Sequence, residues 1–137
     1  MDRADIAIIG TGPAGISAAI NARVRRKSFW LFGSNRLSAK VESSEQIVNY
    51  PAVGAVSGAQ LNELFREQMK KLEIPIIEER ITGVYKMGDY YLIMADRKQY
   101  EASAVIIATG VETVRAFPGE RELLGRGVSY CATCDGR

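Results

Sequence analysis

Residues 5–15 read Asp-Ile-Ala-Ile-Ile-Gly-Thr-Gly-Pro-Ala-Gly, and this stretch decides the fold. Its first half is a largely β-branched apolar run, which suits a strand buried on both faces of a parallel sheet. Its second half fits the pattern G-x-G-x-x-G at Gly10, Gly12 and Gly15. The first glycine allows a tight turn, the second lets the backbone approach a pyrophosphate, and the third lets a helix pack closely on the strand. The stretch therefore predicts a strand, a phosphate-binding turn and a helix.

The segments on either side extend this unit. Residues 14–26 are rich in alanine with apolar residues at helical spacing, and residues 28–32 read as a second strand, which completes a βαβ unit of about the usual ~30 residues. Residues 33–57 show no periodicity, and a loop of this length is commonly explained by a bound ligand.

The rest of the chain predicts alternating helix and strand. A capping box of Ser57 and Gln60 starts a helix that we expect to end near Glu73. A short strand at 74–77, a hairpin over 81–94 around Gly88-Asp89, and an all-apolar strand at 104–108 follow. The predicted fold class is α/β, a three-layer Rossmann-like domain with a parallel sheet and a small β-meander.

Composition limits the partners and the compartment. The chain has 137 residues, 47% hydrophobic and 25% charged, with a net charge of +2, as expected for a globular domain without a nucleic-acid or membrane partner. The N-terminus lacks the features of a signal peptide, and no apolar stretch approaches the ~20 residues that span a bilayer. We therefore expect a cytoplasmic protein.

An acidic residue that often accompanies the glycine pattern is missing. In dinucleotide-binding folds a carboxylate about 20 residues further on holds a ribose hydroxyl, but no Asp or Glu occurs between residues 5 and 42. Two interpretations remain open: FAD with its ribose held by neutral groups such as Ser34 and Asn35, or NADP with its extra phosphate on Arg36. An NADP-binding module without flavin is thus the alternative function, and Arg36 can equally be a solvated loop residue.

The cysteines carry the second chemical signal. Cys131 and Cys134 are separated by two small residues and followed by Asp135. Such a pair can cycle between dithiol and disulfide, and the neighbouring carboxylate can move the proton that each step requires. A zinc site is the competing interpretation, but the chain has no other Cys and no His, so zinc would need a second chain. We expect no metal site within this chain.

Four segments together resemble one family. They are residues 10–15, Ile-Ile-Ala-Thr-Gly at 106–110, Pro-Gly at 118–119, and above all Gly-Arg-Gly-Val-Ser-Tyr-Cys-Ala-Thr-Cys-Asp-Gly at 125–136. They are similar to the N-terminal part of low-molecular-weight thioredoxin reductases, which are flavin-dependent disulfide reductases. The resemblance implies an FAD-binding domain over 1–112, and a crossover with the start of a second domain over 113–137.

The resemblance also assigns roles to residues. It makes Cys134 the thiol nearer the flavin, Cys131 the thiol that attacks the disulfide of a thioredoxin-like protein, and Asp135 the proton donor and acceptor. The residues implied for FAD binding are Gly10, Gly12, Pro13, Ala14, Gly15, Gly33, Ser34, Asn35, Asn49, Thr109 and Gly110.

Two departures from the family pattern affect the electron donor and the extent of the chain. The loop after Phe32 lacks the Gly-Gly-Gln segment of NADPH-dependent enzymes and is similar to a divergent clostridial-type branch, some of whose members use ferredoxin, so both NADPH and ferredoxin stay open. Family members are typically homodimers and continue beyond the point that matches Arg137. We therefore expect this chain to be part of a longer polypeptide, and to be inactive alone.

Overall fold

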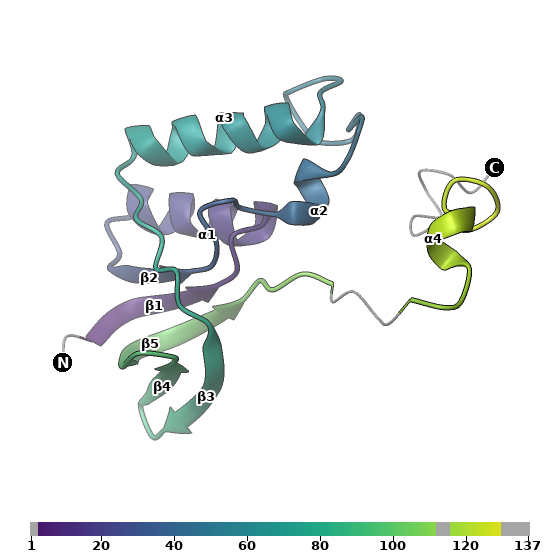
Figure 1. Ribbon diagram of the computed structural model, residues 1–137. Coiled ribbons are helices and arrows are strands. Elements are labelled where there is room, and N and C mark those ends of the chain that lie inside the picture. Colours follow the sequence, from purple (N-terminus) through teal and green to yellow (C-terminus); the bar gives the residue numbers. More distant parts are fainter. Residues whose placement is uncertain (1–2, 112–115, 130–137) are drawn as a thin grey trace.

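Five strands form one sheet in the computed structural model, in the order β2-β1-β5-β4-β3 (Figure 1). The structure describes residues 3–111 and 116–129. The strands are β1 (Arg3–Ile9), β2 (Phe29–Phe32), β3 (Ile81–Met87), β4 (Tyr90–Ala95) and β5 (Gln99–Ile107). The helices are α1 (Pro13–Val24), α2 (Ala39–Glu42), α3 (Gly58–Lys71) and α4 (Glu120–Leu123).

The sheet is mixed. β1 pairs in parallel with both β2 and β5, with Ile8 opposite Leu31 on one side and Ile106 on the other. β5 also pairs antiparallel with β4, and β4 with β3, so the predicted meander is continuous with the predicted parallel sheet. The expected strand at 74–77 is reduced to a single parallel bridge between Ile77 and Phe32.

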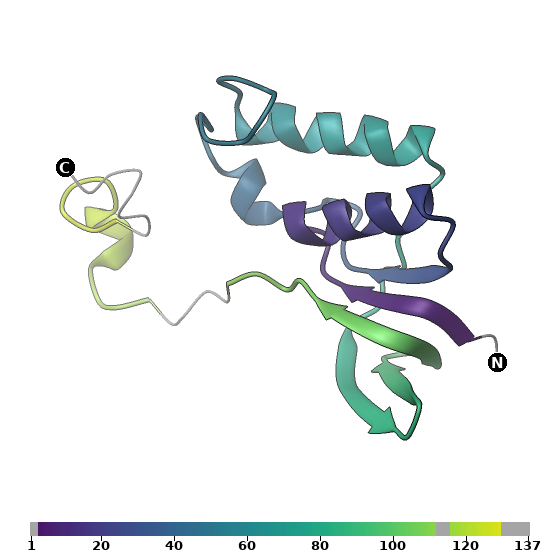
Figure 2. The same cartoon turned by 180° about the vertical axis from the view of Figure 1, so that it is seen from behind.

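Two cores lie on opposite faces of the sheet because successive residues of a strand point to opposite sides. Ile8 packs in a buried cluster with Ile16 of α1 and Phe65 of α3. On the other face, Ile9 packs in a second cluster with Ile93 of β4. Figures 1 and 2 show that α1 covers one side of the sheet and that α3 is stacked over α1. The β3–β4 hairpin lies on the side of the sheet opposite these two helices. This arrangement matches the predicted three layers.

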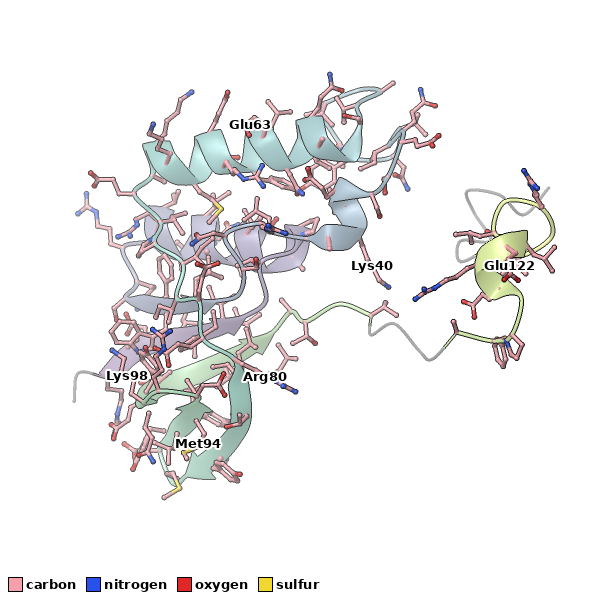
Figure 3. The ribbon with its side chains drawn as sticks, viewed as in Figure 1. Lys40, Glu63, Arg80, Met94, Lys98 and Glu122 are labelled. Atoms are coloured by element: carbon pink, nitrogen blue, oxygen red, sulfur yellow. The ribbon has the colours of Figure 1, made fainter. Side chains whose placement is uncertain are left out.

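The long helices begin within one residue of the positions that the sequence predicts. α1 starts at Pro13 directly after Gly12, one residue earlier than expected, and it ends at Val24 instead of residue 26. α3 has the predicted capping box: Gln60 N donates to Ser57 Oγ (3.1 Å), and Ser57 N donates to Gln60 Oε1 (2.9 Å). Figure 3 shows Glu63 on the face of α3 that is turned away from α1.

The loop expected over residues 33–57 contains one turn of helix that the sequence analysis missed. In α2, Val41 N donates to Ser38 Oγ at 3.2 Å, which caps the turn. The side chain of the fully buried Asn62 on α3 donates to Ser38 O (3.2 Å) and to Glu42 Oε2 (2.6 Å). These bonds hold the segment against α3.

The carboxyl end of β5 is apolar but uncovered among the described residues. Ile106 is 38% exposed and Ile107 is 64% exposed. Figures 1 and 2 both show α4 apart from the sheet. No helix within 3–111 or 116–129 is long and apolar enough to cross a membrane.

Candidate functional site

The glycine turn lies between the carboxyl ends of β2 and β5. Gly10 N donates to Phe32 O at 2.8 Å, and Ala108 N donates to Ile9 O at 2.8 Å. Gly10 has a φ of 120°, and a Cβ atom placed on it would lie only 2.1 Å from Ala108 O. Only glycine fits this position without moving the backbone.

The three glycines of the motif have different neighbours. A Cβ on Gly15 would lie 1.8 Å from Gly10 O, so the close approach of α1 to the strand requires glycine there. A Cβ on Gly12 would meet nothing closer than the Ser38 Cβ at 3.9 Å. The protein itself therefore needs Gly10 and Gly15, whereas the open space beside Gly12 fits the backbone approach of a ligand.

The start of α1 is suited to an anion. Its N-cap residue Gly12 has no side chain to accept from the amides of the first turn, and the first turn holds no acidic residue. The first turn of a helix has amides without intrahelical partners and the positive end of the helix dipole. Pro13 and Ala14 are the first two residues of the helix, at the end where a pyrophosphate would be held.

Thr11 joins the glycine turn to the loop after β2. The Thr11 hydroxyl accepts from Ser34 N at 3.0 Å and donates to Ser34 O at 3.1 Å, while the residue is only 5% exposed. A Cβ on Gly33 would lie 2.4 Å from the Thr11 side chain, so Gly33 leaves room for this contact. The structure thus brings the predicted residues 10–15 and 33–35 together. Thr11 was missed because it stands at a variable position of the motif.

A carboxylate reaches this loop from a distant part of the chain. Asn35 N donates to Glu78 Oε1 at 2.8 Å. Glu78 was missed by the sequence analysis, although it directly follows the expected strand at 74–77, whose carboxyl end would meet the same edge of the sheet. The neighbouring Arg36 is exposed; its N–H donates to Ser34 Oγ (3.1 Å) and its carbonyl accepts from Arg66 Nη2 (3.3 Å).

The other predicted FAD residues lie at different distances from the turn. Thr109 and Gly110 follow β5, and Thr109 N would be 3.1 Å from a Cβ on Gly10. Asn49 is exposed in the loop between α2 and α3, and in the described part of the chain no hydrogen bond joins it to the glycine turn. The adjacent Tyr50 packs edge-on against Phe65, with ring centroids 5.5 Å apart.

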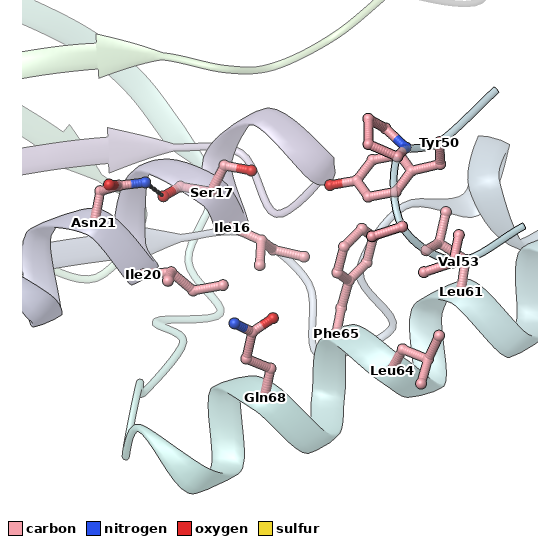
Figure 4. Close-up of a pocket in the computed structure, with 12 residues that line it drawn as sticks. Ile16, Ser17, Ile20, Asn21, Tyr50, Val53, Leu61, Leu64, Phe65 and Gln68 are labelled. Atoms are coloured by element: carbon pink, nitrogen blue, oxygen red, sulfur yellow. Dashed lines mark hydrogen bonds between the residues drawn. The ribbon is translucent and has the colours of Figure 1, made fainter.

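A hollow of about 340 Å³ opens between α1, α3 and the loop after Asn49 (Figure 4). Apolar side chains dominate its wall, including Ile16, Ile20 and Phe65. None of the predicted site residues lines it. The hollow belongs to the packing of α1 against α3 and not to the glycine turn.

Cys131, Cys134 and Asp135 lie outside the described residues. Among residues 3–111 and 116–129, no group of three or more His, Cys, Asp or Glu side chains is placed to hold a metal ion. Away from the turn, burial raises the pKa of the Tyr100 phenol, helped by its hydrogen bond to Glu79 Oε1 (3.0 Å). This group supports the core under β5 and does not face the glycine turn.

Comparison with known proteins confirms the resemblance. The chain is 37% identical over 134 residues to thioredoxin reductase of Peptoclostridium acidaminophilum, and 38% identical over 133 residues to that of Bacillus subtilis. Each alignment covers 96% of this chain and 42% of the relative, so the chain spans less than half the length of these relatives.

Solved structures show the same fold. A ferredoxin-flavin thioredoxin reductase from Clostridium acetobutylicum is 53% identical with a TM-score of 0.81, over 98% of this chain and 47% of that one. Thioredoxin reductase from Streptococcus pyogenes is 36% identical with a TM-score of 0.83, over 98% and 44%. The Rossmann-like fold expected from the sequence is therefore the fold of thioredoxin reductases. A family model described as pyridine nucleotide-disulphide oxidoreductase matches residues 4–136, and the chain belongs to that family.

Proposed function

We propose that this chain is the FAD-binding part, with the redox disulfide, of a thioredoxin-reductase-like flavoenzyme. The observation that carries the proposal is the glycine turn, which is closed by protein at Gly10 and Gly15 and open at Gly12 beside the first turn of α1. Membership of the family and the cysteine run at 131–134 support the disulfide chemistry.

The residues around the turn would bind FAD in parts. The amides at the start of α1 would hold the pyrophosphate, and the loop of Gly33, Ser34 and Asn35 would take the adenosine ribose. Asn49, Thr109 and Gly110 complete the proposed FAD site. When bound, FAD would supply two-electron chemistry to the cysteine pair.

The cysteines would pass those electrons on. Reduction of the Cys131–Cys134 disulfide consumes two electrons and two protons and gives two thiols. The Cys131 thiolate would then attack a disulfide of a thioredoxin-like protein, and Cys134 would resolve the mixed disulfide. Asp135 would accept and return the proton.

The electron donor is either NADPH or a ferredoxin. Support for ferredoxin comes from the absent Gly-Gly-Gln segment and from the 53% identity to a ferredoxin-flavin enzyme. The proposal places the protein in the cytoplasm as a homodimer, in keeping with the family resemblance.

A spectrum of the full-length protein tests this function. We expect a flavin absorption band, and anaerobic titration with dithionite should consume about four electrons per flavin, two for FAD and two for the disulfide. Cys134→Ser should consume only two. A full-length protein that stays colourless with added FAD, or takes up only two electrons before and after the substitution, contradicts the proposal; binding of NADP alone would favour the flavin-free alternative.

Two further measurements on the same sample address the donor and the assembly. Flavin bleaching by NADPH is compared with bleaching by reduced ferredoxin. Sedimentation at equilibrium gives the mass of the assembly, and a monomeric mass contradicts the homodimer.

A further inference from the structure

We propose that Glu78 supplies the carboxylate that the loop after β2 lacks, and that it makes the adenosine end of the site select an unmodified ribose over a 2′-phosphorylated one. This inference rests on the proposed function, because it concerns the same dinucleotide site. It assigns a specificity-determining role to a residue more than forty positions away from the loop that it serves.

The backbone brings Glu78 to the correct edge of the sheet. Ile77 lies beside β2 as a parallel bridge to Phe32, with Ile77 N donating to Leu31 O (2.8 Å) and Gly33 N donating to Ile77 O (3.2 Å). Residue 78 is thus the first position past the carboxyl end of this short pairing. In open α/β sheets, ligands bind outside the carboxyl ends of the strands.

The side chain is anchored by one oxygen. Asn35 N donates to Glu78 Oε1 at 2.8 Å, and in the described part of the chain no hydrogen bond or ion pair engages Oε2. Glu78 is exposed, so a ligand in the loop can reach the second oxygen. The Asn35 amide therefore fixes a carboxylate beside the position where related folds carry their ribose-binding acid.

The chemistry of a carboxylate decides which ribose it accepts. The 2′ and 3′ hydroxyls of an unmodified ribose are donors, and a carboxylate is an acceptor only, so the pair forms charge-assisted hydrogen bonds. A 2′-phosphate has no such donor at physiological pH and adds negative charge next to Glu78. FAD carries an unmodified adenosine ribose, whereas NADP carries the phosphate.

Basic side chains near the loop would favour the opposite selection, for a 2′-phosphorylated ribose. Arg66 and Lys70 line a hollow of about 290 Å³ next to Asn35, and Arg36 is on the same loop. Arg66 is already engaged by Glu63 Oε2 (3.3 Å) and the carbonyl of Arg36 (3.3 Å). The Glu78 carboxylate accepts from the backbone amide of Asn35, one of the residues proposed to take the ribose, whereas Arg66 is held at Arg36 and Glu63. We therefore assign the selection to Glu78.

Calorimetric titration of the flavin-free full-length protein tests this assignment. The probes are FAD, ADP-ribose and 2′-phospho-ADP-ribose, and the variants are Glu78→Gln and Glu78→Ala. Glu67→Gln is the matched control, because it removes one exposed carboxylate from α3. Melting temperatures show whether each variant is folded.

The wild type should bind ADP-ribose at least about tenfold more tightly than its 2′-phosphorylated form, and both Glu78 variants should lose most of that preference. Glu67→Gln should keep it. Equal weakening of both ligands would mean that Glu78 only holds the loop, and a wild-type preference for the phosphorylated form would assign the site to the cations; either result overturns the proposal. If the wild type binds FAD but its preference for ADP-ribose over the phosphorylated form does not depend on Glu78, this inference fails and the proposed function stands. If the wild type binds no FAD, both this inference and the proposed function fail.

Discussion

The atoms that a Cβ would meet distinguish the roles of the glycines in the motif. At Gly15 an added methyl group would overlap the Gly10 carbonyl, at a separation of 1.8 Å, and neither backbone can move without breaking the contact between α1 and β1. At Gly12 the same methyl group meets only the Ser38 side chain at an ordinary contact distance. The same substitution should therefore affect folding at one position and ligand binding at the other.

Gly15→Ala should abolish the cooperative thermal unfolding transition, because a backbone clash cannot be relieved by a rotamer change. Gly12→Ala should melt within a few degrees of the wild type, since replacing glycine by alanine at an N-cap costs only roughly 0.5 kcal/mol, but it should lose most of its affinity for FAD. Circular dichroism and flavin fluorescence measure the two effects. A Gly12→Ala protein with unchanged FAD affinity would contradict the open-turn interpretation.

Asp5 gives a pH-dependent contribution to stability. Its carboxylate accepts from Ser28 N (2.9 Å) and Ser28 Oγ (3.0 Å), and these bonds lower the pKa of Asp5 from its usual 3.8. Because the folded pKa lies below the unfolded one, the stabilisation is present above pH 3.8 and is lost as the pH falls through the folded pKa.

Asp5→Ala should therefore lower the free energy of unfolding at pH 7, and the difference from the wild type should shrink as the pH falls below 3.8. Urea unfolding at several pH values measures this. Ser28→Ala removes the hydroxyl that donates to the Asp5 carboxylate and accepts from Asp5 N, but it keeps the Ser28 N–H bond to the carboxylate, so its pH-dependent effect should be smaller and of the same sign. A difference that is constant with pH would contradict this prediction.

The helices show how far local sequence determines an element. The capping box at Ser57 and Gln60 predicts the start of α3, and the structure has both of its hydrogen bonds. In contrast, α2 has only four residues, and its position depends on the amide of Asn62 from α3. A contact between residues twenty or more positions apart leaves no periodic signal in the segment itself.

Ser57→Ala should destabilise the protein by about 1 kcal/mol, because Gln60 N loses its acceptor at the start of α3. For a chain of this size the melting temperature should fall by roughly 3–4 °C. Ser43→Ala at the exposed end of α2 is the control and should change it much less. Equal shifts in the two variants would show that the capping box adds nothing beyond an ordinary surface hydroxyl.

In the candidate site, too, some features can be predicted from the local sequence and others depend on contacts between distant segments. The glycine motif predicts the turn because the fold requires glycine at Gly10 and Gly15 and leaves open space beside Gly12. Glu78 and Thr11 were missed because their contacts depend on how β1, β2 and the segment at residue 77 align, and this alignment is a property of the whole sheet. The expected strand at 74–77 pointed to the right edge but was too long, since Pro75 cannot donate a ladder hydrogen bond.

At the scale of the molecule, the described surface has several large apolar side chains that nothing covers. Those beyond the middle of β5 are Ile106, Ile107, Val111, Phe117, Leu123 and Leu124, each between 38% and 79% exposed. Exposed apolar patches promote association in solution.

The 137-residue chain expressed by itself should therefore self-associate and bind the dye ANS, and Ile107→Lys should reduce both. Val24→Lys is a matched control, because Val24 is 68% exposed at the end of α1, away from β5. Light scattering and dye fluorescence are the measurements. A chain that is monomeric and does not bind the dye would show that these exposed apolar side chains do not promote association.

The position of β1 in the sheet also affects the order of events during synthesis. Its parallel partner β5 is encoded nearly a hundred residues later, as the pairing of Ile6 with Ala104 shows. A ribosome adds roughly 5–20 residues per second, so β1 waits for several seconds with one edge unpaired. Pairings between distant segments also form slowly because they close long loops. Of the five strands in this sheet, β1 is thus synthesised before the other four but is among the last to be fully paired, and the nascent protein should depend on chaperones during that interval.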